Sequence, residues 1–197
     1  MTRERAAGTR TVGAAPHPLP VHVREIRIDA VETVASGDVP ASLRIHGVLV
    51  DHRPRNMPDW IQHDGDVIHH MEVTLTVSWP ELVITAIEGT MRTVPHPEVC
   101  PDAVPPLQSL IGIAVGRGFT RAVNERIGRE RGCTHVAALI QAMGPVVRQG
   151  AGAAFGFVKP GSGATPWFIN SCQAWREGGP LHRQFLPDVA AGAPPQD

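Results

Sequence analysis

Cys133 and His135 are the residues whose types and spacing most directly predict chemistry. They stand in the run Gly132-Cys133-Thr134-His135, which leads into a segment with helical spacing of apolar residues. A cysteine at the start of a helix lies among unpaired backbone N–H groups and near the positive end of the helix dipole, which together favour a thiolate. We therefore predict a nucleophile or metal ligand at Cys133 and a proton-transfer group at His135. Alternatively, the run only caps the helix, and Cys133 is a small buried apolar group.

Strand periodicity identifies His69 and Asp51 as a second candidate pair. Alternation in residues 67–78 places His69 on the apolar face, and the same count in residues 42–52 places Asp51 on the inner face of its strand. A carboxylate that holds an inward histidine is the usual orienting partner of a general base or a metal ligand. We predict such a pair if the two strands are neighbours. The alternative is a structural histidine, with Asp51 capping a turn.

The cysteines open a different possibility, because three of them cannot all pair within one chain. With His135 they supply four soft or borderline ligands, which could bind zinc or an iron–sulfur cluster. The predicted metal ligands are Cys100, Cys133, His135 and Cys172. No C-x-x-C knuckle is present, so the spacing does not identify a metal, and the cofactor stays open between zinc, iron and none.

These residues must be positioned by strands that come first and helices that follow. Alternating or β-rich stretches predict strands at 23–33, 42–52, 67–78 and 81–90. Helical spacing predicts helices at about 107–114, 119–131 and 133–143, the last broken by Gly144-Pro145. Residues 167–175 and 181–185 are predicted to form a final hairpin. The order predicts an α+β fold, with an antiparallel β-sheet packed against about three α-helices and a C-terminal hairpin.

Length and composition predict one domain at 21–187, with disordered tails at 1–20 and 188–197. A net charge of -1 gives no general affinity for nucleic acid or an anionic membrane. Because no apolar run approaches a signal peptide or a membrane span, the free cysteines indicate a reducing cytoplasm. The oligomeric state is left open.

Several short runs resemble one protein family over about residues 44–185. They are Gly47-Val48-Leu49-Val50-Asp51, Ile68-His69-His70-Met71, Cys100 after the prolines, Leu110-Ile111-Gly112, Gly132-Cys133-Thr134-His135 and Asn170-Ser171-Cys172. On these runs the chain resembles the family known as domain of unknown function 2889. The resemblance supports the choice of positions and implies no activity. His70 stands where it implies an acidic residue, and Gln173 stands where it implies a histidine.

The residues together lead us to expect a small-molecule enzyme. Cys133 and His135 would provide the thiol and the proton-transfer group, and His69 with Asp51 would support them. The substrate would be an organic acid or its thioester, and the reaction hydrolysis, isomerisation or lyase chemistry. The alternatives are a metal- or cluster-binding protein and a non-catalytic domain that binds a ligand.

Overall fold

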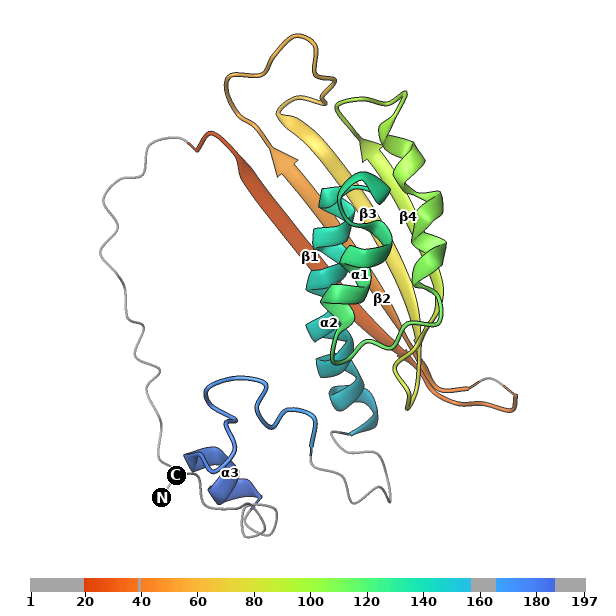
Figure 1. The fold of residues 1–197 in the computed structure, drawn as a ribbon, viewed down its shortest axis with the longest axis vertical. Coiled ribbons are helices and arrows are strands. Elements are labelled where there is room, and N and C mark those ends of the chain that lie inside the picture. Colours follow the sequence, from red (N-terminus) through yellow and green to blue (C-terminus); the bar gives the residue numbers. More distant parts are fainter. Residues whose placement is uncertain (1–19, 39, 157–165, 187–197) are drawn as a thin grey trace.

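The computed structural model describes residues 20–38, 40–156 and 166–186. Four strands form one antiparallel sheet, in which each strand pairs with the next one along the chain (Figure 1). The strands are β1 (Val23–Thr33), β2 (Ser42–His52), β3 (Val67–Ser78) and β4 (Ile84–Thr93). The α+β prediction is confirmed, and the first three strands have the predicted bounds. The predicted tails lie outside the described residues, apart from Pro20.

The sheet buries one face because its apolar residues alternate along each strand. In β2, for example, Leu43, Ile45 and Leu49 are at most 1% exposed. The register shifts at the end of β2, where Asp51 pairs with His69 but His52 pairs with Val67. One extra residue in β3 therefore interrupts the alternation, as in a β-bulge, and such bulges re-aim side chains at the ends of sheets.

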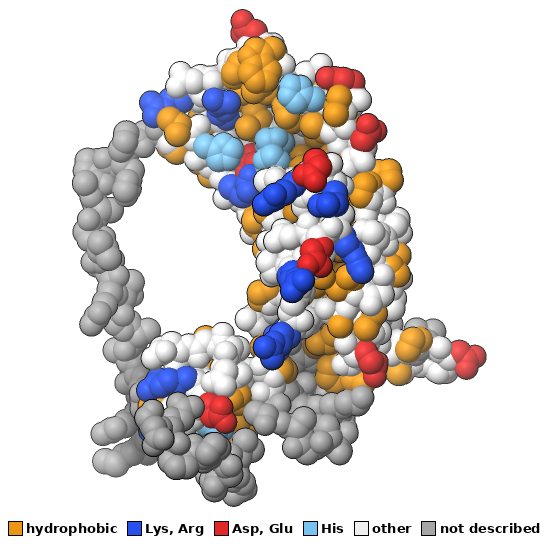
Figure 2. Space-filling view, viewed as in Figure 1, with side chains coloured by type: hydrophobic (Ala, Val, Ile, Leu, Met, Phe, Trp, Pro, Cys, Tyr) orange, Lys and Arg blue, Asp and Glu red, His pale blue; other side chains and the backbone are white. Residues whose placement is uncertain are grey.

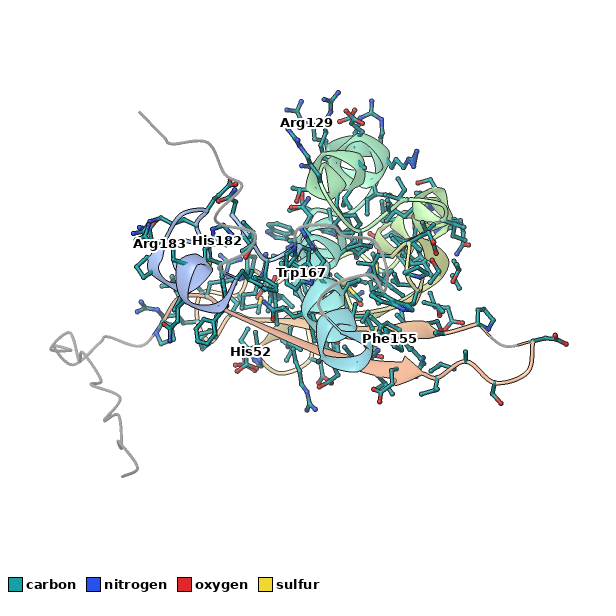
Figure 3. The ribbon with its side chains drawn as sticks, turned by 90° about the horizontal axis from the view of Figure 1, so that it is seen from below. His52, Arg129, Phe155, Trp167, His182 and Arg183 are labelled. Carbon is teal, nitrogen blue, oxygen red and sulfur yellow. The ribbon has the colours of Figure 1, made fainter. Side chains whose placement is uncertain are left out.

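Helices cover the apolar face of the sheet, as Figure 3 shows with the sheet seen nearly edge on. The α-helices are α1 (Phe119–Ile127), α2 (Thr134–Phe155) and α3 (Pro180–Phe185). Short 3-10 helices are η1 (Cys100–Ala103), η2 (Pro105–Leu110) and η3 (Arg129–Arg131). The described residues contain no helix that is both long and apolar enough to cross a membrane.

The predicted break at Gly144-Pro145 is wrong, because α2 continues through Pro145 to Phe155. Proline lacks an N–H group and costs a helix interior about 3 kcal/mol. Beyond it, however, Val147 and Ala151 are 0% and 2% exposed within the core. Burial of these side chains offsets the missing hydrogen bond, so packing prevails over local preference.

The segment predicted as a helix at 107–114 forms η2 instead. Leu107 and Leu110 are buried, which suits the three-residue spacing of a 3-10 helix. The next apolar residue of the predicted helix, Ile111, does not continue the buried face, since it is 43% exposed. Gly112 then adopts a φ of +87°, which ends any helical course.

The predicted C-terminal hairpin is also wrong. Residues 166–179 form turns, and the segment that follows is the helix α3. Pro180 lies in the first turn of α3, where its fixed φ favours a helix and its missing N–H has no cost. The sheet therefore ends at β4, and the C-terminal segment packs beside the helices.

Gly47 allows α2 to lie close against the sheet. A Cβ atom at this position would come within 3.1 Å of Leu139 Cδ1 and of Met143 Sδ. The close approach fixes the height of α2 above β2. Its N-terminal end consequently comes to the place where β2 ends and β3 begins, the end of the sheet that carries Asp51 and His69.

Candidate functional site

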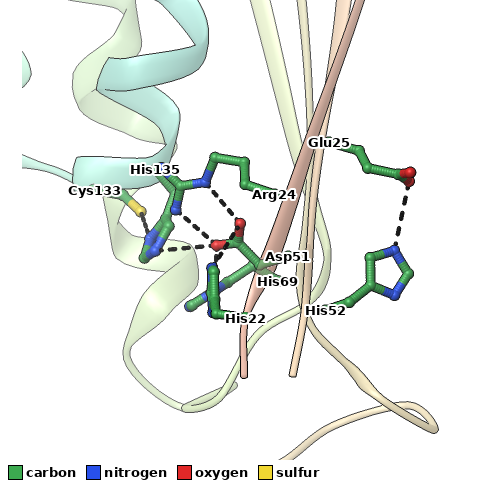
Figure 4. A network of polar contacts seen from close by, with 8 residues as sticks. All are labelled: His22, Arg24, Glu25, Asp51, His52, His69, Cys133 and His135. Carbon is green, nitrogen blue, oxygen red and sulfur yellow. Dashed lines mark hydrogen bonds and ion pairs between the residues drawn. The ribbon is translucent and has the colours of Figure 1, made fainter. Parts of the chain in front are cut away.

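Asp51 is the centre of a group of polar side chains on the helix-covered side of the sheet (Figure 4). Its side chain is 0% exposed. Arg24, its direct neighbour in the β1–β2 register, donates from Nε to Asp51 Oδ1 at 2.7 Å and from Nη2 to Oδ2 at 2.8 Å. A two-pronged contact of this kind is the strongest form of carboxylate recognition and compensates the burial of the charge.

Two imidazole rings approach the same carboxylate. His69 Nδ1 lies 3.0 Å from Asp51 Oδ2, which is the predicted pairing between β2 and β3. His135, from the first turn of α2, places Nε2 at 3.5 Å from the same oxygen. The two rings stack with centroids 3.7 Å apart. A histidine from β3 and a histidine from α2 thus approach the same oxygen atom of Asp51, which lies on β2.

Cys133 completes the arrangement from the start of α2. It is the N-cap residue, with an extended backbone, and its side chain makes no capping hydrogen bond. Its Sγ lies instead 3.5 Å from His135 Nδ1. Gly132 makes this turn possible, because a Cβ there would lie 2.6 Å from the carbonyl oxygen of Ile127.

A further imidazole lies at the exposed edge of the group. His22 Nε2 is 3.4 Å from Asp51 Oδ1, and its side chain is 44% exposed. Figure 4 also shows that the pair formed by His52 and Glu25 lies on the opposite side of the strands. We call Arg24, Asp51, His22, His69, Cys133 and His135 the polar cluster.

Burial and charge determine the protonation states in the polar cluster. Burial favours the neutral form of Asp51, but the hydrogen bonds and charge of Arg24 outweigh it, so the pKa of the carboxyl is lowered. Burial lowers the pKa of His69, with Asp51 acting in the opposite direction. Burial and the neighbouring His69 ring lower the pKa of His135 to about 4. At neutral pH the cluster therefore contains one carboxylate, one guanidinium and two neutral inner imidazoles.

This arrangement has the chemistry of a nucleophile, a base and an orienting group. A neutral His135 that carries its proton on Nε2 points it toward Asp51 and leaves the lone pair of Nδ1 toward the Cys133 thiol. His69 donates from Nδ1 to Asp51, which leaves its own Nε2 as an acceptor. The thiol is therefore next to an atom that can take its proton.

The structure brings four of the predicted site residues together and leaves two apart. Asp51, His69, Cys133 and His135 meet in the polar cluster. Cys100 begins η1 and packs half-buried against the core. Cys172 is exposed in the C-terminal segment. Within the described residues, the predicted ligand set of Cys100, Cys133, His135 and Cys172 is therefore not assembled, because these residues come from separate parts of the fold.

Another set of donors is close enough to hold a metal ion. Ligand atoms of Asp51, His69 and His135 all lie within 4.8 Å of one another. Two histidines and a carboxylate suit zinc or iron. Arg24, however, places its positive charge on both oxygens of Asp51, and that charge opposes a cation at the same carboxylate.

Arg24 and His22 were not predicted as site residues. Arg24 lies in β1, and His22 directly precedes that strand. Ile26 and Ile28 share one face of this strand, and the same two-residue alternation extends to Arg24 and to His22. An arginine on the apolar face of a strand requires a buried partner, and Asp51 was already predicted on the inner face of β2.

Comparison with known protein families gives a match over most of the described chain. A family model described as "Protein of unknown function (DUF2889)" matches residues 22–149, which is more than half of the chain. Searches of curated proteins and of solved structures found no significant match.

Proposed function

Since the chain belongs to the DUF2889 family, and the matched region contains every residue of the polar cluster, we propose that it is a small-molecule enzyme that uses Cys133 as its nucleophile. One observation carries the proposal. Cys133 Sγ, the two ring nitrogens of His135 and the buried carboxylate of Asp51 form a continuous chain with steps of 3.5 Å. This is the order of groups that thiol-dependent acyl transfer requires.

Hydrolysis of a thioester or another activated organic acid is the reaction that this chain of groups serves best. The Cys133 sulfur attacks the acyl carbon while its proton passes to His135 Nδ1, and the leaving thiol takes that proton as its bond to the acyl carbon breaks. Water then attacks the acyl-cysteine with His135 as its base, which releases the acid and restores the thiol. The same proton transfer would serve isomerisation or lyase chemistry.

The start of α2 favours an anionic group of the substrate. The first backbone N–H groups of α2 lie beside Cys133, where they can stabilise an oxyanion. Figure 2 shows histidine side chains gathered at the upper end of the molecule, close to several basic side chains. Asp51, the carboxylate in the polar cluster, is fully buried and already paired with Arg24. Because Arg24 is occupied by Asp51, a carboxylate or phosphate of a substrate would bind through the backbone N–H groups at the start of α2.

The test is hydrolysis of a panel of acyl thioesters, followed by release of the free thiol. We expect Cys133→Ser and His135→Gln each to lower kcat/KM by about a hundredfold or more. Cys100→Ser is the matched control, because it removes a half-buried thiol outside the polar cluster, and it should retain activity within about twofold. Full activity in Cys133→Ser would refute the proposal. So would iodoacetamide labelling that modifies Cys100 as fast as Cys133.

A metal site is the second candidate, and the grouping of Asp51, His69 and His135 favours it. Metal analysis of the purified chain separates the two functions. About one zinc or iron per chain that disappears in His69→Gln would support the metal site. A metal-free chain that hydrolyses thioesters would support the thiol enzyme. A non-catalytic ligand-binding domain would be supported if Cys133→Ala and His135→Ala left both ligand binding and stability intact.

A further inference from the structure

A hollow lies away from the polar cluster, between the helices and the C-terminal segment. It has a volume of about 1010 Å³ and lies between α1, the second half of α2 and residues 167–185. That volume is at the upper end of the range for small-molecule pockets. We call it the aromatic hollow, after the side chains of Phe119, Trp167, Phe168, Trp175 and Phe185 that line it.

The rings on the C-terminal side form a connected wall. Phe168 lies 4.5 Å from Trp175 between ring centroids, and Trp175 lies 6.2 Å from Phe185. Trp167 meets Phe168 edge to face at 6.1 Å. Rings held by one another at such spacings present flat apolar faces, and these suit a planar aromatic group better than a flexible chain.

Arg148 supplies the charge in this hollow. It comes from α2, is half-buried, and is the charged side chain among the lining residues. Its Nη2 donates to the backbone carbonyl of Trp167 at 3.2 Å, and its guanidinium carbon lies 4.7 Å from the centroid of the Trp167 ring. Among the described residues, no carboxylate comes within ion-pair distance of it. The guanidinium is thus held in place with donors left over.

The aromatic hollow is separate from the polar cluster. His135 and Arg148 stand thirteen residues apart on α2, which is about 20 Å along a helix axis. His135 faces the end of the sheet at Asp51, whereas Arg148 faces Trp167. The two regions would therefore bind different molecules or different parts of a large one, and the hollow requires its own ligand.

We propose that the aromatic hollow binds a planar aromatic carboxylate. The rings would enclose the aromatic part, and Arg148 would form a charge-assisted pair with the carboxylate. A partly buried guanidinium without an acidic neighbour favours an anion over a neutral molecule of the same shape. This inference does not depend on the reaction proposed for Cys133.

Calorimetric titration of the full chain with 2-naphthoate and with its neutral analogue 2-naphthamide tests the proposal. We expect naphthoate to bind about tenfold or more tightly than the amide, since the two differ in charge and share the ring system. Arg148→Gln should abolish this preference and leave amide binding unchanged. Trp175→Ala should weaken both. Arg121→Gln is the matched control, because it removes an exposed arginine of α1 that is already paired with Glu125 and does not line the hollow.

Protection of thiols locates the bound probe. Cys172 lines the hollow, whereas Cys133 belongs to the polar cluster. Bound naphthoate should slow the alkylation of Cys172, measured by mass spectrometry of the peptides, and leave that of Cys133 unchanged. Protection of Cys133 alone would overturn the proposal, because the probe would then lie in the polar cluster. Equal affinity for the two probes, a preference that survives Arg148→Gln, or no binding of either probe by the folded chain would overturn it as well.

Discussion

The polar cluster and the aromatic hollow lie along the same helix and treat charge in opposite ways. In the polar cluster, the buried carboxylate of Asp51 has partners on both oxygens, and Arg24 is committed to it. In the aromatic hollow, the Arg148 guanidinium has a carbonyl and a ring as its contacts, and no carboxylate among the described residues lies near it. A charge that is paired with an opposite charge stabilises the fold, whereas a guanidinium without an acidic partner can bind an anionic ligand.

The two regions also differ in their relation to the family. The match spans residues 22–149 and so includes the whole polar cluster. The ring wall of the hollow at 167–185 lies beyond it. The family match therefore covers the polar cluster and the side of the hollow formed by α1 and α2, Arg148 included, but not the ring wall.

The largest effect should follow from removing the charge at the centre of the polar cluster. Asp51→Ala leaves the largely buried His69 and the Arg24 guanidinium, whose side chain is 34% exposed, without their partner, and we expect a loss of about 3 kcal/mol of unfolding free energy. Urea denaturation measures this loss. Asp66→Asn is the matched control, because Asp66 lies exposed beside His52, and it should change stability by less than about 0.5 kcal/mol. Equal losses in the two variants would show that Asp51 is not a structural centre.

A smaller loss should follow from Gly132→Ala, which tests how the backbone positions Cys133. The added Cβ would lie 2.6 Å from the Ile127 carbonyl, so the chain must shift at a cost of about 2 kcal/mol. The thiol would move with it, and alkylation of Cys133 should change rate. Gly116→Ala, beside the aromatic hollow, adds a Cβ with no atom within 4 Å, and its melting temperature should stay near that of the wild type.

Acid should weaken the polar cluster through its histidines. In the folded chain the pKa of His135 is lowered to about 4 from 6.5. Between these values the unfolded chain binds more protons, so stability is complete above pH 6.5 and falls as the pH drops toward 4. We expect a loss of about 1–2 kcal/mol over this window. His135→Gln should flatten the profile, whereas His63→Gln, an exposed loop variant, should retain it.

The smallest effect is expected at the ring wall. Trp175→Ala removes the contacts with Phe168 and Phe185 and should cost about 1 kcal/mol. The pH profile of stability should keep the wild-type shape, because no histidine of the polar cluster is touched. A changed profile would mean that the two regions are energetically coupled through α2.

Much of the polar cluster could be predicted from the sequence, because strand periodicity is a local signal. The two-residue alternation of side chains along a strand predicted that Asp51 and His69 lie on inner faces. The antiparallel register sets them opposite each other. The start of α2 at Cys133 followed from the apolar spacing after it. Arg24 was missed although the same alternation points it inward, because an arginine in a strand is usually solvent-exposed, and its role follows only from the β1–β2 register that sets it opposite Asp51.

The aromatic hollow could not be predicted in this way. It depends on α2 continuing past Pro145 and on the turns of residues 166–179, and both outcomes are decided by packing between distant segments. Cys172 was taken as a metal ligand because a thiol type says nothing of its surroundings. The structure places it, exposed, at the lining of the aromatic hollow, away from the other predicted ligands.

Pro145 has a mechanical consequence for the helix that joins the two regions. Without an N–H group it cannot donate to the carbonyl of Gln141, so α2 lacks one backbone hydrogen bond between His135 and Arg148. Helices bend most readily at such a gap. We therefore expect the backbone amides next to Pro145 to exchange with solvent faster than those of the buried turns on either side of it.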